Sequence, residues 1–258
     1  MANAYYTWLQ NLHAQFYTAV SALKPGIRQA ALYQYRQAIK KMKAAHTYSA
    51  LHTGLASFSS CYPALNLLYK KAGRIRIIGQ ANKNMALLPA YAHVKNMPQA
   101  LTPVKNKAFA SWKKSLQNVS SHLHKEARQW LQHCLLLLPD PGTKQTTYLM
   151  EPPVQPLPSC TQHWHAYRRQ IKQWVIGIEA KAPGYKIPRP QKLAQLKAMH
   201  QQLGQWHDWV DVLTLLETLK KQLDKADYYL LKQQANTMLL QQQKMVKQLA
   251  SHRVLPGQ

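Results

Sequence analysis

The sequence predicts an all-α protein, and three observations carry this prediction. Apolar residues recur at spacings of three and four along most of the 258 residues, as they do on one face of a helix. The chain has no β-hairpin signal and no run of alternating apolar and polar residues. Prolines are dense between Pro139 and Pro158, which precludes a helix there and marks a connection between two helical parts. We therefore expect one domain over 1–258, with a first half over 1–138, a linker over 139–160 and a second half over 161–258.

The first half is expected to hold a series of helices separated by proline and glycine. They are predicted over 4–22, over 27–53, from Pro63 onward, around 85–93 and over 105–138. Pro25 and Gly26 end the first of these helices, and Gly54 ends the second. Pro63 suits the first turn of a helix, because the N–H that it lacks would have no helical partner there. Pro139 ends the last of them.

Helices resume in the second half, over 161–180, 191–203, 206–223 and 226–253. Pro183 and Gly184 interrupt the chain after the first, and a gap at Gly204 separates the second from the third. Most tryptophans stand at helical spacing among aliphatic residues and are therefore expected in the core: Trp112, Trp130, Trp164, Trp174, Trp206 and Trp209.

Charged and apolar residues separate cleanly along 33–43. At about 100° per residue, one stripe within roughly 60° is basic and the stripe beside it is apolar. The basic stripe consists of Arg36, Lys40 and Lys43, and the apolar one of Tyr35, Ile39 and Met42. The apolar stripe is expected to face the core, and the basic stripe to face an anion.

The same layout returns at an offset of 132 residues, where Arg168 and Lys172 repeat Arg36 and Lys40. The apolar stripe repeats there as Tyr167, Ile171 and Trp174. A second signal keeps nearly the same offset, because Gly73 follows Arg36 by 37 residues and Gly204 follows Arg168 by 36. Two matched signals at one offset predict an internal duplication.

These motifs resemble the CHAD family, the conserved histidine α-helical domain, whose pattern H-x-x-R-x-x-x-K/R-x-x-R is followed some 35 residues later by L-G-x-x-R/N-D, twice per chain. The second half keeps the residues of this pattern in register: His165, Arg168, Lys172, Glu179, Leu203, Gly204 and Asp208. The first half departs from it, with Tyr33 in place of the histidine and Ile77 in place of the aspartate. Over nearly the whole chain, from Arg28 to the C-terminal helix, the resemblance implies two pseudo-symmetric bundles with a basic groove or pore that binds inorganic polyphosphate.

The charge of the chain is one-sided. Its formal net charge is +25, with 34 Lys and Arg against 9 Asp and Glu, and the first acidic residue is Glu126. Internal ion pairs cannot neutralise such an excess, so it is expected to attract an external polyanion. A charge that served solubility alone would mix both signs on the surface.

The basic stripes and their neighbours supply the expected polyphosphate-binding residues: Arg28, Arg36, Lys40, Lys43, Arg74, Arg76, His165, Arg168, Arg169, Lys172 and His207. Polyphosphate is a flexible chain without bases, so its recognition requires charge and hydrogen-bond donors along a groove. Arg offers bidentate donors to phosphate oxygens, and Lys offers a mobile point charge. The two stripes are expected to face each other across one groove, with His165 either binding a phosphate oxygen or bonded to a backbone carbonyl.

No catalytic residue, cofactor or metal is expected. The pairs His122 with His124 and His163 with His165 are spaced i, i+2, so they point apart on a helix and chelate poorly. Asp208 and Asp211 share a helix face that would suit Mg²⁺, yet the first half has no carboxylate to complete a site for phosphoryl chemistry. Asp208 is therefore expected to hold a nearby Arg or Lys in place, and Glu179 likewise.

The same positive charge would also attract two alternative ligands: the phosphates of DNA or RNA, and an acidic protein tail. Paired inward stripes favour a narrow groove for a thin polymer, whereas a duplex binder displays an exposed recognition helix.

The chain has few cysteines, and none stands in a C-x-x-C arrangement, which indicates reduced thiols. The sequence shows neither a signal peptide nor an apolar run long enough to span a bilayer. We expect a cytoplasmic protein, associated with polyphosphate granules, that does not bind membranes.

Overall fold

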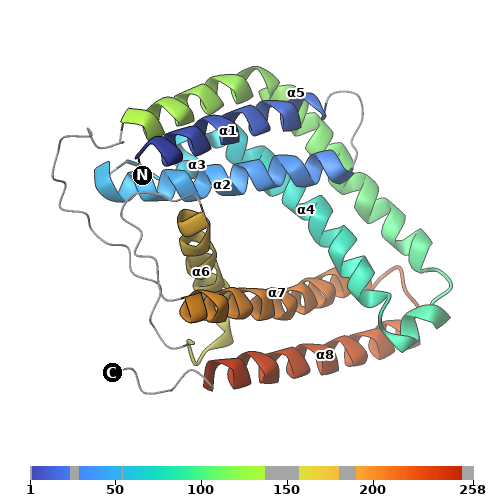
Figure 1. Ribbon diagram of the computed structural model, residues 1–258. Coiled ribbons are helices and arrows are strands. Elements are labelled where there is room, and N and C mark those ends of the chain that lie inside the picture. Colours follow the sequence, from blue (N-terminus) through green and yellow to red (C-terminus); the bar gives the residue numbers. More distant parts are fainter. Residues whose placement is uncertain (1, 24–28, 54, 137–156, 180–189, 252–258) are drawn as a thin grey trace. The chain divides into compact units, whose positions relative to one another are not determined.

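The computed structural model describes residues 2–23, 29–53, 55–136, 157–179 and 190–251, and within these ranges all regular structure is helical (Figure 1). The α-helices are α1 (Ala2–Ser21), α2 (Gln29–Thr53), α3 (Phe58–Cys61), α4 (Pro63–Met85), α5 (Met97–Leu136), α6 (Trp164–Glu179), α7 (Pro190–Leu219) and α8 (Lys225–Ser251). Two short 3₁₀ helices accompany them, η1 (Pro89–His93) and η2 (Thr161–His163). The predicted all-α class is confirmed, while most of the predicted linker lies outside the described residues.

The chain folds into two compact units, and each consists of three separate stretches of the sequence. The first unit consists of 1–73, 110–152 and 173–187, and the second of 74–109, 153–172 and 188–258. Helices α4, α5 and α6 each contribute residues to both units. Each unit is described by itself below.

The first unit is built around the pair of α1 and α2, which lie side by side (Figure 1). The apolar stripes predicted for both helices are buried: Tyr5, Leu9, Leu12, Phe16 and Val20 on α1, and Tyr35, Ile39 and Met42 on α2. Helix α5 joins this core through Trp130, whose indole N–H donates to the carbonyl of Met42 at 3.0 Å. The ring of Tyr17 on α1 stacks on His124 of α5 at 4.7 Å.

Glu126, the first acidic residue of the chain, caps the N-terminus of α4. The carboxylate of Glu126, on α5, is buried and accepts hydrogen bonds from the backbone N–H groups of Ala64 at 3.0 Å and Leu65 at 2.9 Å. These are first-turn donors of α4, which have no partner within a helix. Pro63 begins α4, as predicted, and has no N–H to satisfy. Glu126 therefore caps α4 and places its negative charge at the positive end of that helix.

The second unit is built around the antiparallel pair of α7 and α8. The amide of Gln202, in the middle part of α7, donates to Gln242 at 2.6 Å, and the hydroxyl of Tyr228 donates to Glu217 at 2.7 Å near the connection between the two helices. The 3₁₀ helix η1 packs on α8 and is held there by a hydrogen bond from the backbone N–H of Ala90 to the Gln234 side chain, at 3.1 Å.

Three predicted helix boundaries are wrong. Helix α7 continues through Gly204, where a gap was expected, because Leu203, Trp206 and Trp209 keep burying one helix face across the glycine. That burial outweighs the cost of about 1 kcal/mol for a glycine inside a helix. Helix α5 begins at Met97 and includes Pro103, instead of beginning at 105. The helix predicted around 85–93 is a turn followed by η1.

The predicted core tryptophans are confirmed, since each of the six is at most 6% exposed. The cysteines Cys61, Cys134 and Cys160 are all free thiols. Among the described residues, none of the helices combines the length and the apolar character that crossing a membrane would require.

Candidate functional site

The basic stripe of α2 contacts α4 inside the first unit. Arg36 is only 8% exposed, and its Nη1 donates to the carbonyl of Tyr69 at 2.7 Å. The guanidinium carbon lies 4.4 Å from the centroid of the Tyr69 ring. Lys43 Nζ lies 4.6 Å from the same centroid and donates to Asn66 Oδ1 at 2.7 Å. One aromatic ring therefore serves two cations, and each contact is of the cation–π kind.

Gly73 provides the space in which the Arg36 guanidinium lies. A Cβ atom built on Gly73 would stand 2.6 Å from Nη1 of Arg36, which is closer than real Cβ contacts allow. We call the group of Arg36, Lys43, Asn66, Tyr69 and Gly73 the first cluster. It lies wholly within the first unit.

The second unit repeats this arrangement. A Cβ atom built on Gly204 of α7 would stand 3.1 Å from Nη2 of Arg168, which comes from α6. Both arginines thus lie against a glycine in the middle of a neighbouring helix, at the positions that the sequence repeat pairs. We call the group of His165, Arg168, His207, Asp208 and Asp211 the second cluster.

Two imidazoles lie against each other in the second cluster. The ring centroids of His165 and His207 are 4.6 Å apart, and Nδ1 of His207 lies 3.3 Å from the Asp211 carboxylate. Burial lowers the pKa of His165, and the charges of His207, Arg169 and Arg168 lower it further, whereas Asp211 raises it. Near neutral pH, His165 is therefore a neutral donor and acceptor.

The carboxylate of Asp208 has arginines beside it, as predicted. Burial raises the pKa of Asp208, while the positive charges of Arg76 and Arg168 lower it. That Asp208 holds these guanidinium groups in place stays a prediction.

His207, Asp208 and Asp211 also have ligand atoms within 4.8 Å of one another, and such donors are used by divalent cations. The charges of Arg76 and Arg168 oppose a cation at this place. The absence of a metal site stays a prediction.

The remaining predicted binding residues differ in exposure. Arg74 and Arg76 on α4 and Arg169 on α6 are exposed, whereas Lys40 and Lys172 are half-buried. Arg28 lies outside the described residues. The structure brings Arg36 and Lys43 together in the first cluster, and His165, Arg168 and His207 together in the second. A groove between the two stripes stays a prediction.

Three residues of the clusters are not among those predicted from the sequence: Asn66, Tyr69 and Asp211. Asn66, Tyr69 and Gly73 stand at i, i+3 and i+7 and thus share one face of α4. This spacing was a usable signal, because it lines a polar group, an aromatic ring and a glycine along one side of a helix.

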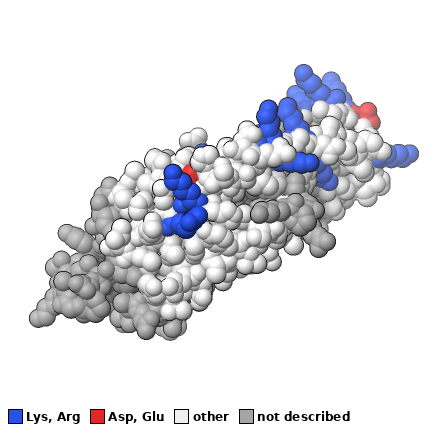
Figure 2. Space-filling view, turned by 90° about the horizontal axis from the view of Figure 1, so that it is seen from above, with Lys and Arg blue, Asp and Glu red and all other residues white. Residues whose placement is uncertain are grey.

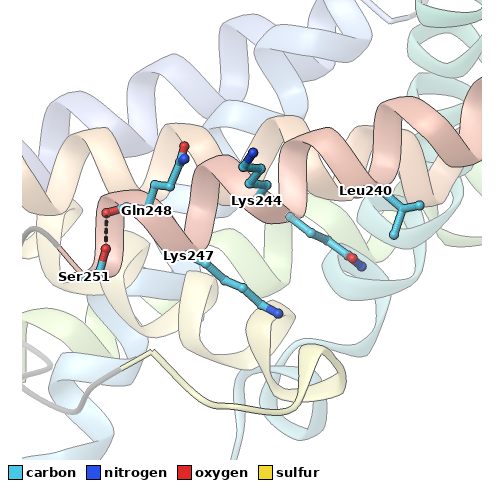
Figure 3. A pocket seen from close by; sticks show the side chains of 6 residues that line it. Leu240, Lys244, Lys247, Gln248 and Ser251 are labelled. Atoms are coloured by element: carbon cyan, nitrogen blue, oxygen red, sulfur yellow. Dashed lines mark hydrogen bonds between the residues drawn. The ribbon is translucent and has the colours of Figure 1, made fainter.

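Two surface pockets lie elsewhere. One, of about 480 Å³, runs along α8 and has no carboxylate in its lining (Figure 3). Its lining residues are Leu240, Gln243, Lys244, Lys247, Gln248 and Ser251. The other pocket, of about 570 Å³, lies between α1 and α2 and is lined largely by amide and small side chains. On the face of the molecule shown in Figure 2, Lys and Arg side chains far outnumber acidic ones.

Comparisons with known proteins place the fold. No protein-family model matches the chain, and no curated protein matches it. The chain is similar to the crystal structure of the CHAD domain from the plant Ricinus communis, with a TM-score of 0.66 and 16% identity, over 100% of this chain and 93% of that one. It is also similar to PptA from Streptomyces chartreusis, with a TM-score of 0.61 and 12% identity, over 98% of each chain.

The chain is thus an all-helical protein that holds an arginine against a glycine in each of two units. Its fold is that of the CHAD domain.

Proposed function

We propose that this chain is a member of the CHAD family and binds inorganic polyphosphate without catalysing a reaction on it. The observation that carries the proposal is the repeated arginine-on-glycine arrangement, with Arg36 on Gly73 and Arg168 on Gly204. It keeps a guanidinium at matched places in both units of a chain whose net charge is +25. The motifs that resemble the CHAD family are the ones that contain these four residues.

The chemistry of the clusters suits a phosphate polymer. Polyphosphate has about one negative charge per phosphate, and guanidinium and ammonium groups donate charge-assisted hydrogen bonds to phosphate oxygens. Exposed Arg76 adds a donor beside the second cluster, and exposed Arg74 stands two residues before it on α4. Neutral His165 adds a further hydrogen-bond donor to the second cluster. We place the protein in the cytoplasm, at polyphosphate granules.

A pair of charge-matched variants tests this proposal. Arg74→Glu with Arg76→Glu reverses two exposed cations of the candidate site, and Lys220→Glu with Lys221→Glu reverses two exposed cations that follow the C-terminal end of α7. Both double variants change the net charge equally, so a general polyanion attraction falls equally in both. We expect polyphosphate affinity to fall at least about tenfold in the arginine variant, as for the loss of one charge-assisted contact.

The lysine variant is expected to keep nearly all of its affinity near physiological salt, where exposed charges far from the ligand are screened. Isothermal titration of both variants with long-chain polyphosphate measures the difference. Equal losses would contradict a defined site at the second cluster and leave only unspecific charge attraction.

A further inference from the structure

Two cations share the ring of Tyr69, although like charges repel each other. The Arg36 guanidinium and the Lys43 ammonium lie 4.4 and 4.6 Å from the ring centroid. Each is also fixed by a hydrogen bond, from Arg36 to the Tyr69 carbonyl and from Lys43 to Asn66. The negative face of an aromatic ring attracts both cations, so Tyr69 holds them at fixed places.

Gly73 controls where the guanidinium can lie. With any side chain at this position, Nη1 of Arg36 would have to leave its place. Since Nη1 is the far end of a flexible side chain, the arginine would move and the helices would stay. Gly79, on the same helix, differs in this respect, because a Cβ atom there would meet nothing within 4 Å.

We infer that Tyr69 and Gly73 are positioning residues, which hold Arg36 and Lys43 as a fixed pair of cations for adjacent phosphates of one polymer. The inference rests on the proposed function. Neither residue needs to touch the ligand, because each acts through the cations that it places. Gly204 has the same role for Arg168 in the second unit.

The physical advantage of such a pair is preorganisation. Long side chains lose much rotamer freedom when they bind a ligand, and a side chain that is already fixed in the free protein avoids that loss. A phosphate polymer offers successive charges to both cations at once, whereas a single orthophosphate ion offers only one group. The pair is therefore expected to raise affinity for polyphosphate more than for orthophosphate.

Four single variants of the full chain test this inference by polyphosphate titration. Tyr69→Leu removes the ring, whereas Tyr69→Phe keeps it and serves as the conservative control. Gly73→Ala displaces Arg36 without changing any charge, and Gly79→Ala makes the same substitution on the same helix where space is open. We expect Tyr69→Leu and Gly73→Ala to bind about tenfold more weakly, and the two controls to bind like the parent.

Thermal unfolding of the same variants distinguishes a positioning role of Tyr69 and Gly73 from a role in stability alone. Alanine favours a helix interior over glycine, so the Tm of Gly73→Ala is expected to equal or exceed that of the parent while its affinity falls. If the parent does not bind polyphosphate, the proposed function fails. If the parent binds and Tyr69→Leu and Gly73→Ala bind equally well, the inference is overturned. Loss of affinity in Tyr69→Phe would also overturn it, because the ring would then not be the acting group.

Discussion

His165 is disfavoured as a cation in the folded protein, because it is partly buried and lies beside His207 and two arginines. Its pKa in the fold is therefore lower than in the unfolded chain, which binds the proton more readily. The stability that neutral His165 contributes is present above its ordinary pKa of about 6.5 and is lost as the pH falls from that value through the lower pKa of the folded state. The raised pKa of Asp208 acts in the opposite sense, at more acidic pH, since the folded state then binds the extra proton.

His165→Gln is accordingly expected to reduce the pH dependence of stability. The Tm of the parent should fall between about pH 7.5 and pH 5.5, and that of the variant should fall less, because glutamine does not titrate. Thermal unfolding followed by circular dichroism at both pH values measures this difference. His163→Gln provides the control, because it changes an exposed histidine two residues before His165. This variant should keep the pH dependence of the parent. An identical pH dependence in parent and His165→Gln would show that His165 is not destabilised as a cation.

At the same scale, the sequence identified the basic residues of the clusters but not what holds them. Arg36, Lys43 and Arg168 follow from charge and helical spacing, which are local properties. The ring of Tyr69 under two cations depends on how α2 packs on α4, and no spacing within one helix specifies that contact. Asp211 differs, because it stands at i, i+4 from His207 on α7, and this spacing would have predicted their contact.

At the scale of the elements, α4 depends on Glu126, which follows the two first-turn residues that it caps by 62 and 61 positions. Glu126 lies on α5, yet it accepts hydrogen bonds from Ala64 and Leu65 at the beginning of α4. Because α4 carries Asn66, Tyr69 and Gly73, the cap also fixes the helix on which the first cluster is built.

Glu126→Gln is expected to lower the free energy of unfolding by about 1 to 2 kcal/mol, because the amide loses both a charge at the helix N-terminus and one acceptor oxygen. Urea unfolding measures the change. The same substitution at Glu217 provides the control. Its ion pair with Lys232 is exposed, and a glutamine oxygen can still accept from Tyr228, so we expect a clearly smaller effect. Equal effects of the two substitutions would contradict the capping role of Glu126.

Helix positions were largely predictable, whereas some ends were not. The apolar period of α1 and α2 and the N-terminus of α4 at Pro63 were read correctly, because they depend on local spacing and on proline chemistry. The continuity of α7 was not, since a glycine inside a helix is a local cost that only the burial of neighbouring residues offsets. A Cβ atom on Gly204 would crowd the guanidinium of Arg168, and this contact between two helices is not visible in the sequence alone.

For the whole molecule, the dominant property is the excess of 34 basic over 9 acidic residues. Charge of this kind attracts every polyanion, and that attraction weakens steeply with salt. Selectivity that persists near physiological salt therefore requires cations held in fixed positions, and we propose that the two arginine-on-glycine arrangements supply them.

The most direct test is a competition titration near physiological salt, in which unlabelled polyphosphate, duplex DNA or single-stranded RNA displaces labelled long-chain polyphosphate from the protein. We expect polyphosphate to compete at concentrations at least about tenfold lower, per phosphate, than either nucleic acid, because its adjacent phosphates engage the fixed cations while nucleic acids rely on screened attraction. Equal competition by DNA or RNA would contradict a polyphosphate-selective site and would indicate a general polyanion or nucleic-acid binder with the fold of a CHAD domain.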